Sequence, residues 1–323
     1  MGAKYFGAAV RRREDPRFLT GESRFVDDIK LPGLLHAVFL RSLHAHARIR
    51  AIRADAARRH PGVLGVFTFR ELVRWMKPLP TFGSPPPGLA ARVEFRLKHA
   101  PQYPLAQDTV RYVGETIAMV VAESPYVAQD GLDLIEVEYE PLPAVADLVA
   151  GGEAGAPVLH PQWGDNVAVG FTHSVGVPDV AVLSAEVLIR ERFMIQRYVG
   201  MPIEPRGVIA SFDRRDGTLT TWNATQVVHF VQQSVAETLE MPIHKVRVIA
   251  PDVGGGFGVK TGPYREEVLL AWLAVRLGRP VRWASTRRED FETTNQARGS
   301  VCESELALDA DGRILGVRAR IVS

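Results

Sequence analysis

Hydrophobic and polar residues alternate along the first half of the chain in a pattern that predicts a mixed α/β unit. A helix is expected over 126–134, because Ser124 is a good N-cap and Pro125 suits the first helical position. The last predicted strand alternates isoleucine, valine and tyrosine with glutamate, which is typical of a half-buried strand. The predicted strands lie at 34–41, 63–68, 115–123 and 135–143.

The second half predicts two helices, each followed by a strand. The helix over Thr225–Glu240 carries apolar residues at steps of four, and the helix over Tyr264–Leu277 ends before Gly278, a residue suited to a left-handed cap. The strands that follow them lie at 246–250 and 281–285. Asp-Gly turns within 213–219 and 309–315 predict two β-hairpins, because Asp-Gly tolerates the positive φ angles of tight turns.

A glycine- and alanine-rich connector at 150–157 suggests how the chain is divided. We expect an N-terminal arm over 1–14, a first domain over 15–150 and a second domain over 151–323. The proline-rich segment 77–108 interrupts the first domain and predicts a long loop.

Composition excludes several classes of protein. The net charge of +2 comes from 39 basic and 37 acidic residues that are interspersed, so no continuous basic stripe for nucleic acid is expected. No apolar run approaches a membrane span and no leader pattern is found, so a cytoplasmic location is expected. A single cysteine, Cys302, excludes an intrachain disulfide, a cysteine-based zinc site and an iron–sulfur cluster held by this chain alone. Redox chemistry would therefore need an organic or metal cofactor and an external electron acceptor.

The stretch PDVGGGFGVKTG, residues 251–262, lies between a predicted strand and a predicted helix. It is not a P-loop, because Val259 separates Gly258 from Lys260, and Val259 also breaks the dinucleotide-binding spacing. Its glycines permit positive φ angles and would let a flat or anionic ligand lie against the backbone. A close helix–sheet crossing that merely needs small residues is the alternative, and the spacing alone leaves both open.

Other candidate site residues are less specific. His44 and His46 are spaced to lie on one face of a strand and could bind a metal, but no third ligand lies nearby in sequence, which favours a structural role. Glu204 and Arg206 could form a buried pair or lie near a cofactor, and the sequence does not separate these readings. Cys302 is expected to be a packing residue.

Seven motifs follow one another along the chain. They are RREDPRFLTGESRFVDDIKLPGLLHAVFLRSLHAHARI (12–49), VRYVGETIAMVVAES (110–124), IEVEYEPLPAV (135–145), MPIEPRG (201–207), WNATQVVHF (222–230), VRVIAPDVGGGFGVK (246–260) and GRPVRWASTRREDF (278–291). In this order they resemble the molybdenum-binding subunit of the xanthine dehydrogenase, aldehyde oxidase and carbon monoxide dehydrogenase family, and the resemblance extends nearly from end to end.

The resemblance implies an α+β fold class. An α/β hammerhead domain over 15–150 would be followed by part of a mixed α+β molybdenum-cofactor-binding domain over 151–323, incomplete at its C-terminus. It also implies a molybdenum–molybdopterin cofactor, with the cytosine dinucleotide form among the options. The cofactor's own sulfurs hold the metal, so no metal ligand is expected from this chain.

The resemblance assigns cofactor contacts by motif. Gly255, Gly256, Phe257 and Gly258 would supply backbone amides and a packing ring beside the cofactor. Gln226 would donate a hydrogen bond from its amide to a metal-bound oxygen, a role open to an uncharged group with two donors. The alternative for Gln226 is a cap at a helix N-terminus.

The activity implied is hydroxylation of an aldehyde, an N-heteroaromatic compound or carbon monoxide with oxygen from water. A glutamate follows the loop lysine in purine-oxidising members, whereas this chain has Thr261, a substrate-facing candidate that disfavours a purine. The family's base glutamate lies in a later region, so no catalytic residue is expected here. Activity would then require a C-terminal molybdenum-domain chain, an iron–sulfur subunit and an FAD subunit. The alternative is a truncated, catalytically incompetent homologue acting as an assembly or interaction module.

Overall fold

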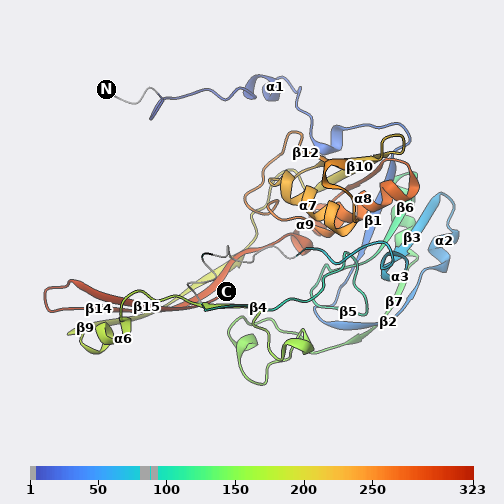
Figure 1. The fold of residues 1–323 in the computed structure, drawn as a ribbon. Helices are drawn as coiled ribbons and strands as arrows, with labels where there is room; N and C mark the ends of the chain where they lie inside the picture. The colour runs from blue at the N-terminus through green and yellow to red at the C-terminus, as the bar shows by residue number, and fades with distance from the viewer. Residues whose placement is uncertain (1–4, 81–87, 89–93) are drawn as a thin grey trace.

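The computed structural model describes residues 5–80, 88 and 94–323. Its largest sheet has seven strands in the order β12-β11-β10-β13-β1-β6-β3 (Figure 1). The strands are β1 (Leu35–Arg41), β3 (Val63–Thr68), β6 (Thr116–Ala122), β10 (Gly207–Asp213), β11 (Thr218–Asn223), β12 (Val246–Ile249) and β13 (Val281–Ala284). Leu35 of β1 lies opposite Val281 of β13 in a parallel pairing. One continuous sheet therefore includes strands from both sides of the 150–157 connector.

The predicted helix over 126–134 is confirmed as α5 (Pro125–Asp133). The Ser124 side chain accepts a hydrogen bond from the Val127 backbone N–H, which satisfies one of the amides left free in a first turn. β6, which precedes it, is buried at every position, since Met119 and Val121 pack into the main core and Ala118 and Val120 pack into a second cluster on the other face.

The two helices of the second half are α7 (Val228–Thr238) and α8 (Arg265–Leu277). α7 begins three residues later than predicted, because the chain before it forms contacts with the glycine loop that are described below. α8 ends at Gly278 with φ of 64°, as predicted. The order β12, glycine loop, α8, β13 also agrees with the prediction.

The main hydrophobic core lies between α8, α7 and the large sheet. Every residue of α8 from Val268 to Ala274 is buried. Trp272 on α8 meets Phe67 edge to face, with ring centroids 5.2 Å apart. Figure 1 shows α7 and α8 lying together over the β10–β12 end of the sheet. The glycine loop thus lies between β12, an edge strand of the sheet, and the largely buried helix α8.

Smaller elements complete the first half. The alternating strand predicted at 135–143 is β7 (Glu136–Pro141), in which Glu136 and Glu138 are exposed as predicted, whereas Glu140 is half-buried. The predicted loop over 77–108 falls partly on residues outside the described ranges. The remaining elements are β2 (Ala47–Arg53), β5 (Thr109–Val110) and β7 (Glu136–Pro141) in one sheet, β4 (Glu94–Leu97) paired with β8 (Val169–Thr172), and the helices α1 (Asp15–Leu19), α2 (Asp55–Arg59) and α3 (Phe69–Leu72).

A three-stranded sheet projects from the body (Figure 1). It consists of β9 (Val187–Tyr198), β14 (Ala297–Leu308) and β15 (Ile314–Val322), with β14 in the centre. The β14–β15 turn and the β10–β11 turn confirm both predicted hairpins, with positive φ at Gly312 and Gly217. The short helices nearby are α6 (Pro178–Leu183) and α9 (Arg287–Thr293). None of the helices in the described ranges has the length and apolar character to cross a membrane.

Candidate cofactor-binding site

The glycine loop adopts a backbone that few residues tolerate. Gly255 and Gly258 have φ of +98° and +87°, and Phe257 between them has φ of +52°. A bulky residue with positive φ is a strained exception, and such strain is concentrated at functional sites. The Phe257 side chain is 72% exposed. The loop therefore holds an aromatic ring at the surface at the cost of a strained backbone.

Gln226 is the residue that shapes this loop from outside it. Its Oε1 accepts hydrogen bonds from the backbone N–H of Gly258 at 3.1 Å and of Lys260 at 3.3 Å. A Cβ at Gly256 would lie 2.5 Å from the Gln226 side chain, so only glycine allows this approach. The helix-cap alternative is wrong, since the N-cap of α7 is Val227 and no side chain caps that end.

The remaining donors of Gln226 and the loop are the ones that could meet a ligand. Both hydrogen bonds of the Gln226 side chain use Oε1, and within the described chain Nε2 has no protein acceptor. The amides of Gly255, Gly256 and Phe257 likewise donate to no protein group among the described residues. The Gly258 amide, by contrast, is already taken by Gln226, so one of the four predicted loop donors is not free. An uncharged set of outward N–H donors fits an anionic, oxygen-rich group such as a pterin-bound metal centre.

A buried ion pair fixes both ends of the loop. Lys260 is 1% exposed, and its Nζ lies 2.9 Å from both Oε2 and the backbone oxygen of Glu204. The same Oε2 accepts the Gly254 N–H at 2.7 Å, and the Glu204 N–H donates back to the Gly254 carbonyl at 3.1 Å. Burial lowers the pKa of Lys260, while the Glu204 hydrogen bond and charge act in the opposite direction. Glu204 thus holds the first glycine and the closing lysine of the loop together.

Arg206 does not pair with Glu204, so the idea of a pair between these two residues is wrong. The Arg206 guanidinium instead lies 3.2 Å from Glu266 and 3.8 Å from Asp290. It also stacks on the Tyr264 ring, with 3.9 Å to the ring centroid. Glu204 and Arg206 therefore serve two separate networks, one in the loop and one beneath it.

The network beneath the loop connects the two halves of the chain. Arg41, from β1, lies 2.6 Å from Glu266 and 3.2 Å from Glu289. Burial alone would raise the pKa of Glu266, but Arg206 and Arg41 together lower it to about 2. A second buried pair joins Arg265 to Glu115 at 2.9 Å. These pairs attach the start of α8, and with it the loop, to the first half of the chain.

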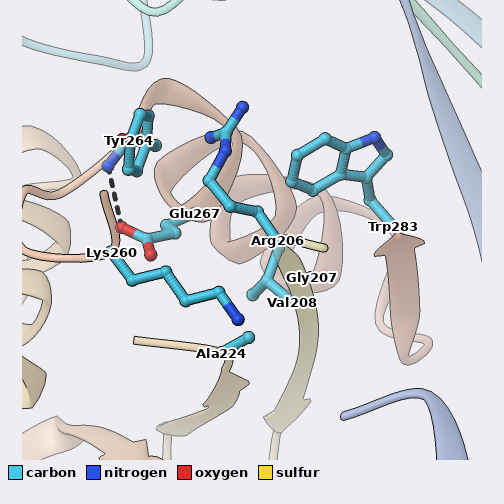
Figure 2. Close-up of a pocket in the computed structure, with 8 residues that line it drawn as sticks. All are labelled: Arg206, Gly207, Val208, Ala224, Lys260, Tyr264, Glu267 and Trp283. Carbon is cyan, nitrogen blue, oxygen red and sulfur yellow. Dashed lines mark hydrogen bonds between the residues drawn. The ribbon is translucent and has the colours of Figure 1, made fainter. Parts of the chain in front are cut away.

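A small cavity lies behind the loop, and Figure 2 shows the side chains that surround it. Its volume is about 10 Å³, close to the smallest space that holds one water molecule. The Tyr264 N–H donates to Glu267 Oε2 at 2.9 Å, which caps the first turn of α8. Burial raises the pKa of Glu267 to about 7. The carboxyl of Glu267, with a raised pKa, therefore lies directly behind the loop and accepts the N–H of Tyr264, the N-cap residue of α8.

The other candidates lie elsewhere. Thr261 is exposed beside the loop, and its N–H donates to the Gly258 carbonyl at 3.2 Å. His46 Nδ1 is hydrogen-bonded to the Pro143 carbonyl at 2.7 Å, while His44 packs on another ring. Within the described ranges, no group of three or more histidine, cysteine, aspartate or glutamate side chains could hold a metal ion. The histidine pair thus has structural contacts.

A large cleft of about 1520 Å³ lies between the first half and the segment around α8 and α9. Its walls include Tyr112, Glu115, His160 and Arg265. Burial raises the pKa of Tyr112 to about 12. Among the described residues that line this cleft, none belongs to the predicted cofactor site. The predicted cofactor-contacting residues therefore lie outside this cleft, with Phe257 and Gly258 exposed.

Two family models match the chain. Residues 20–143 match the aldehyde oxidase and xanthine dehydrogenase a/b hammerhead domain. Residues 159–323 match the molybdopterin cofactor-binding domain. The predicted α+β fold class, with a hammerhead domain followed by a molybdenum-cofactor-binding domain, is confirmed.

Three similar proteins cover nearly all of this chain. The carbon monoxide dehydrogenase large chain of Afipia carboxidovorans is 37% identical, and the 6-hydroxypseudooxynicotine dehydrogenase complex subunit gamma of Paenarthrobacter nicotinovorans is 38% identical. Each alignment covers 98% of this chain and 39% of the relative. The crystal structure of quinoline 2-oxidoreductase from Pseudomonas putida 86 matches with a TM-score of 0.85 at 35% identity, again over 98% of this chain and 39% of that one. This chain spans about two fifths of the length of these relatives.

The Glu204–Lys260 pair was not predicted from the sequence as a site feature. The sequence marks Lys260 only as a lysine at the wrong spacing for a P-loop, and it suggests for Glu204 only a pair with Arg206 or a contact near a cofactor. A fully buried lysine next to a glycine loop could have been suspected from the run GFGVK, but its partner lies 56 residues away.

Proposed function

We propose that this chain, which belongs to the xanthine dehydrogenase, aldehyde oxidase and carbon monoxide dehydrogenase family of molybdenum-binding large subunits, forms one wall of a molybdopterin pocket. The observation that carries the proposal is the hydrogen-bonded unit of Gln226 and the glycine loop. Gln226 uses its oxygen on the loop and keeps its N–H donors for a ligand. The loop amides that lack protein acceptors lie in the same strained turn.

The residues divide the task of holding the cofactor. Gln226 would donate to an oxygen of the metal centre, and the amides of Gly255, Gly256 and Phe257 would bind acceptors beside it. The exposed Phe257 ring would pack on the flat part of the cofactor. When bound, the molybdenum cofactor supplies oxidation of a carbon centre with oxygen from water. This chain's part is to position the cofactor and exclude solvent on one side.

The rest of the machinery would come from the region of the relatives' large chains that is not matched here and from other subunits. Relatives are more than twice as long as the region matched here. We propose that the polypeptide equivalent to their remaining three fifths supplies the opposite wall and the general base. Iron–sulfur and FAD subunits would carry electrons away, in agreement with the absence of cysteine ligands for a cluster in this sequence. A cytoplasmic location and the cytosine dinucleotide form of the cofactor stay predictions.

The substrate class follows from the relatives and from Thr261. Two similar proteins are named for oxidation of carbon monoxide and of a nicotine-derived compound, and a third for quinoline. Thr261 stands where purine-oxidising members carry a glutamate. We therefore propose carbon monoxide, an aldehyde or an N-heteroaromatic compound as the substrate class, with a purine disfavoured.

The test is cofactor retention in the complex purified from its native host. Molybdenum would be measured by mass spectrometry of the metal and pterin by fluorescence after oxidation. We expect Gln226→Ala and Gly256→Val to lose most of both, because each removes part of the Gln226–loop unit. The matched control is Gln233→Ala on the exposed face of α7, where the amide bonds only Glu237. Full molybdenum occupancy in both site variants would refute the assignment, and a well-folded wild-type complex without molybdenum would favour the assembly module.

A further inference from the structure

The projecting sheet of β9, β14 and β15 has two faces of opposite character. Directly opposed residues of an antiparallel sheet share a face, so the pairing register assigns each position. Phe193 lies opposite Cys302, which lies opposite Ile321. Ile189, Leu306 and Val317 form an equivalent row. We call the side carrying these two rows the apolar face.

The other side is a charged face adapted to water. Glu303 lies between Arg192 and Arg320 in one row. Glu305 lies between Arg190 and Arg318 in the next, with Arg190 Nε 2.8 Å from the carboxylate.

The helix α6 also lies on the charged face. Arg318 reaches Asp179 of α6 at 2.8 Å. A Cβ at Gly316 would lie 2.7 Å from Ala181, so α6 lies directly against this side of β15. Among the described residues, α6 is the helix that packs on this sheet. On the opposite side no helix of the described ranges packs in this way.

The apolar face is exposed to a degree that is unusual for large side chains in strands. Phe193 is 54% exposed, Val317 59% and Ile321 66%. Ile189 and Ile195 are also nearly half exposed. Clustered exposed apolar residues of this kind mark interaction sites. A sheet with one charged and one apolar face normally buries the apolar face against another layer.

We infer that the apolar face is the docking surface for the polypeptide equivalent to the remaining three fifths of the relatives' large chains. This inference rests on the proposed function. The structure of quinoline 2-oxidoreductase aligns with 98% of this chain, and the remaining 61% of that protein's length lies outside the alignment. The expected occupant presents an apolar surface. It also carries a cationic or donor group opposite Glu191, an acidic residue at a position of this face.

The position of the face relative to the site strengthens the inference. β9 ends at Tyr198, and at Gly200 just beyond it a Cβ would lie 3.1 Å from Phe257 of the glycine loop. An occupant seated along β9 would thus reach the exposed side of the loop. Docking on the apolar face and closure of the cofactor pocket would then be one assembly event.

The test is site-specific photo-crosslinking in the complete complex from the native host. A benzoylphenylalanine is placed at Phe193 on the apolar face or, as a matched control, at Met194, which is 70% exposed on the charged face. We expect crosslinks from position 193, and not from 194, to peptides that match the region of the large chains beyond the one aligned here. Crosslinks to a second copy of residues 1–323, no crosslink from 193, or equal crosslinking from both positions would overturn the inference.

A second measurement separates this inference from the proposed function. Phe193→Glu should weaken retention of the completing polypeptide by roughly 30-fold, as expected for a central aromatic anchor, while Met194→Glu should leave it unchanged. Circular dichroism of both variants checks that they fold. If Phe193→Glu loses the completing polypeptide and the wild-type complex contains no molybdenum, the proposed function is wrong but the docking surface stands. Unchanged retention by folded Phe193→Glu, with molybdenum present, would sink the docking surface alone.

Discussion

The ion pair between Lys260 and Glu204 is expected to contribute strongly to stability. The Lys260 side chain is 1% exposed and that of Glu204 14%, so neither charge is well solvated. Lys260→Met removes the cation while leaving the carboxylate with one N–H donor, that of Gly254. Breaking a buried pair from one side costs about 3–5 kcal/mol, because an uncompensated charge stays behind.

The double variant distinguishes coupling from two independent losses. Glu204→Gln keeps an acceptor for the Gly254 N–H but leaves the Lys260 ammonium buried without a counter-charge, at a similar cost of about 3 kcal/mol. Lys260→Met combined with Glu204→Gln removes both charges. Its destabilisation should be smaller than the sum of the single losses by about 2 kcal/mol or more, since residues in one buried network couple strongly.

The assay is equilibrium urea unfolding of the chain, followed by tryptophan fluorescence and circular dichroism. Trp283 and Trp272 are 3% and 6% exposed, so unfolding changes their environment. Coincident transitions by both probes, with an unchanged urea dependence, justify comparing free energies of unfolding. Additive single-variant effects, within about 0.5 kcal/mol, would refute the claim that Lys260 and Glu204 hold the loop as a coupled pair.

Three further predictions concern the same region. Gly256→Ala should lower the thermal midpoint, because its Cβ would lie 2.5 Å from Gln226 and overpacking costs about 1–3 kcal/mol. Gly262→Ala, whose added Cβ would meet Asn295 at an ordinary 3.4 Å, should cost less, and a larger loss there would contradict this. The pKa of Glu267 rises from an ordinary 4.5 to about 7, so the folded state binds the proton more tightly than the unfolded state does. The free energy of unfolding should therefore fall by about 3 kcal/mol as pH rises from 4.5 to 7. Urea midpoints of Glu267→Gln should lack this dependence on pH. Glu266 should show the opposite dependence of stability on pH, since its pKa is lowered to about 2. Its contribution to the free energy of unfolding is complete above pH 4.5 and is lost toward pH 2. The difference in urea midpoint between wild type and Glu266→Gln should narrow over that range, and a constant difference would refute the shift.

Local sequence signals predicted most individual elements of this fold. Ser124 and Pro125 marked the start of α5, Gly278 the end of α8, and Asp-Gly turns the two hairpins. These features depend on backbone preferences of residues close in sequence, which is why they can be read without the structure. The start of α7 was misplaced because its first predicted turn is occupied by Gln226 and its neighbours, whose partners lie more than 30 residues away.

The candidate site was predictable in its members but not in their arrangement. Glycine content and motif order pointed to the loop and to Gln226. They did not reveal that Gln226 presents its oxygen to the loop, which decides which donors stay free. Nor did they separate Glu204 from Arg206, which are two residues apart but belong to different buried networks.

The sequence by itself determined the family, the α+β class and the glycine loop, because motifs and turn preferences are local properties of the chain. The tertiary structure decided that β1 joins the sheet of the second half, that Glu204 closes the loop onto Lys260, and that large apolar side chains gather exposed on one face of the projecting sheet. The physical reason is that burial, charge pairing and the side of a sheet on which a residue lies all depend on distant partners.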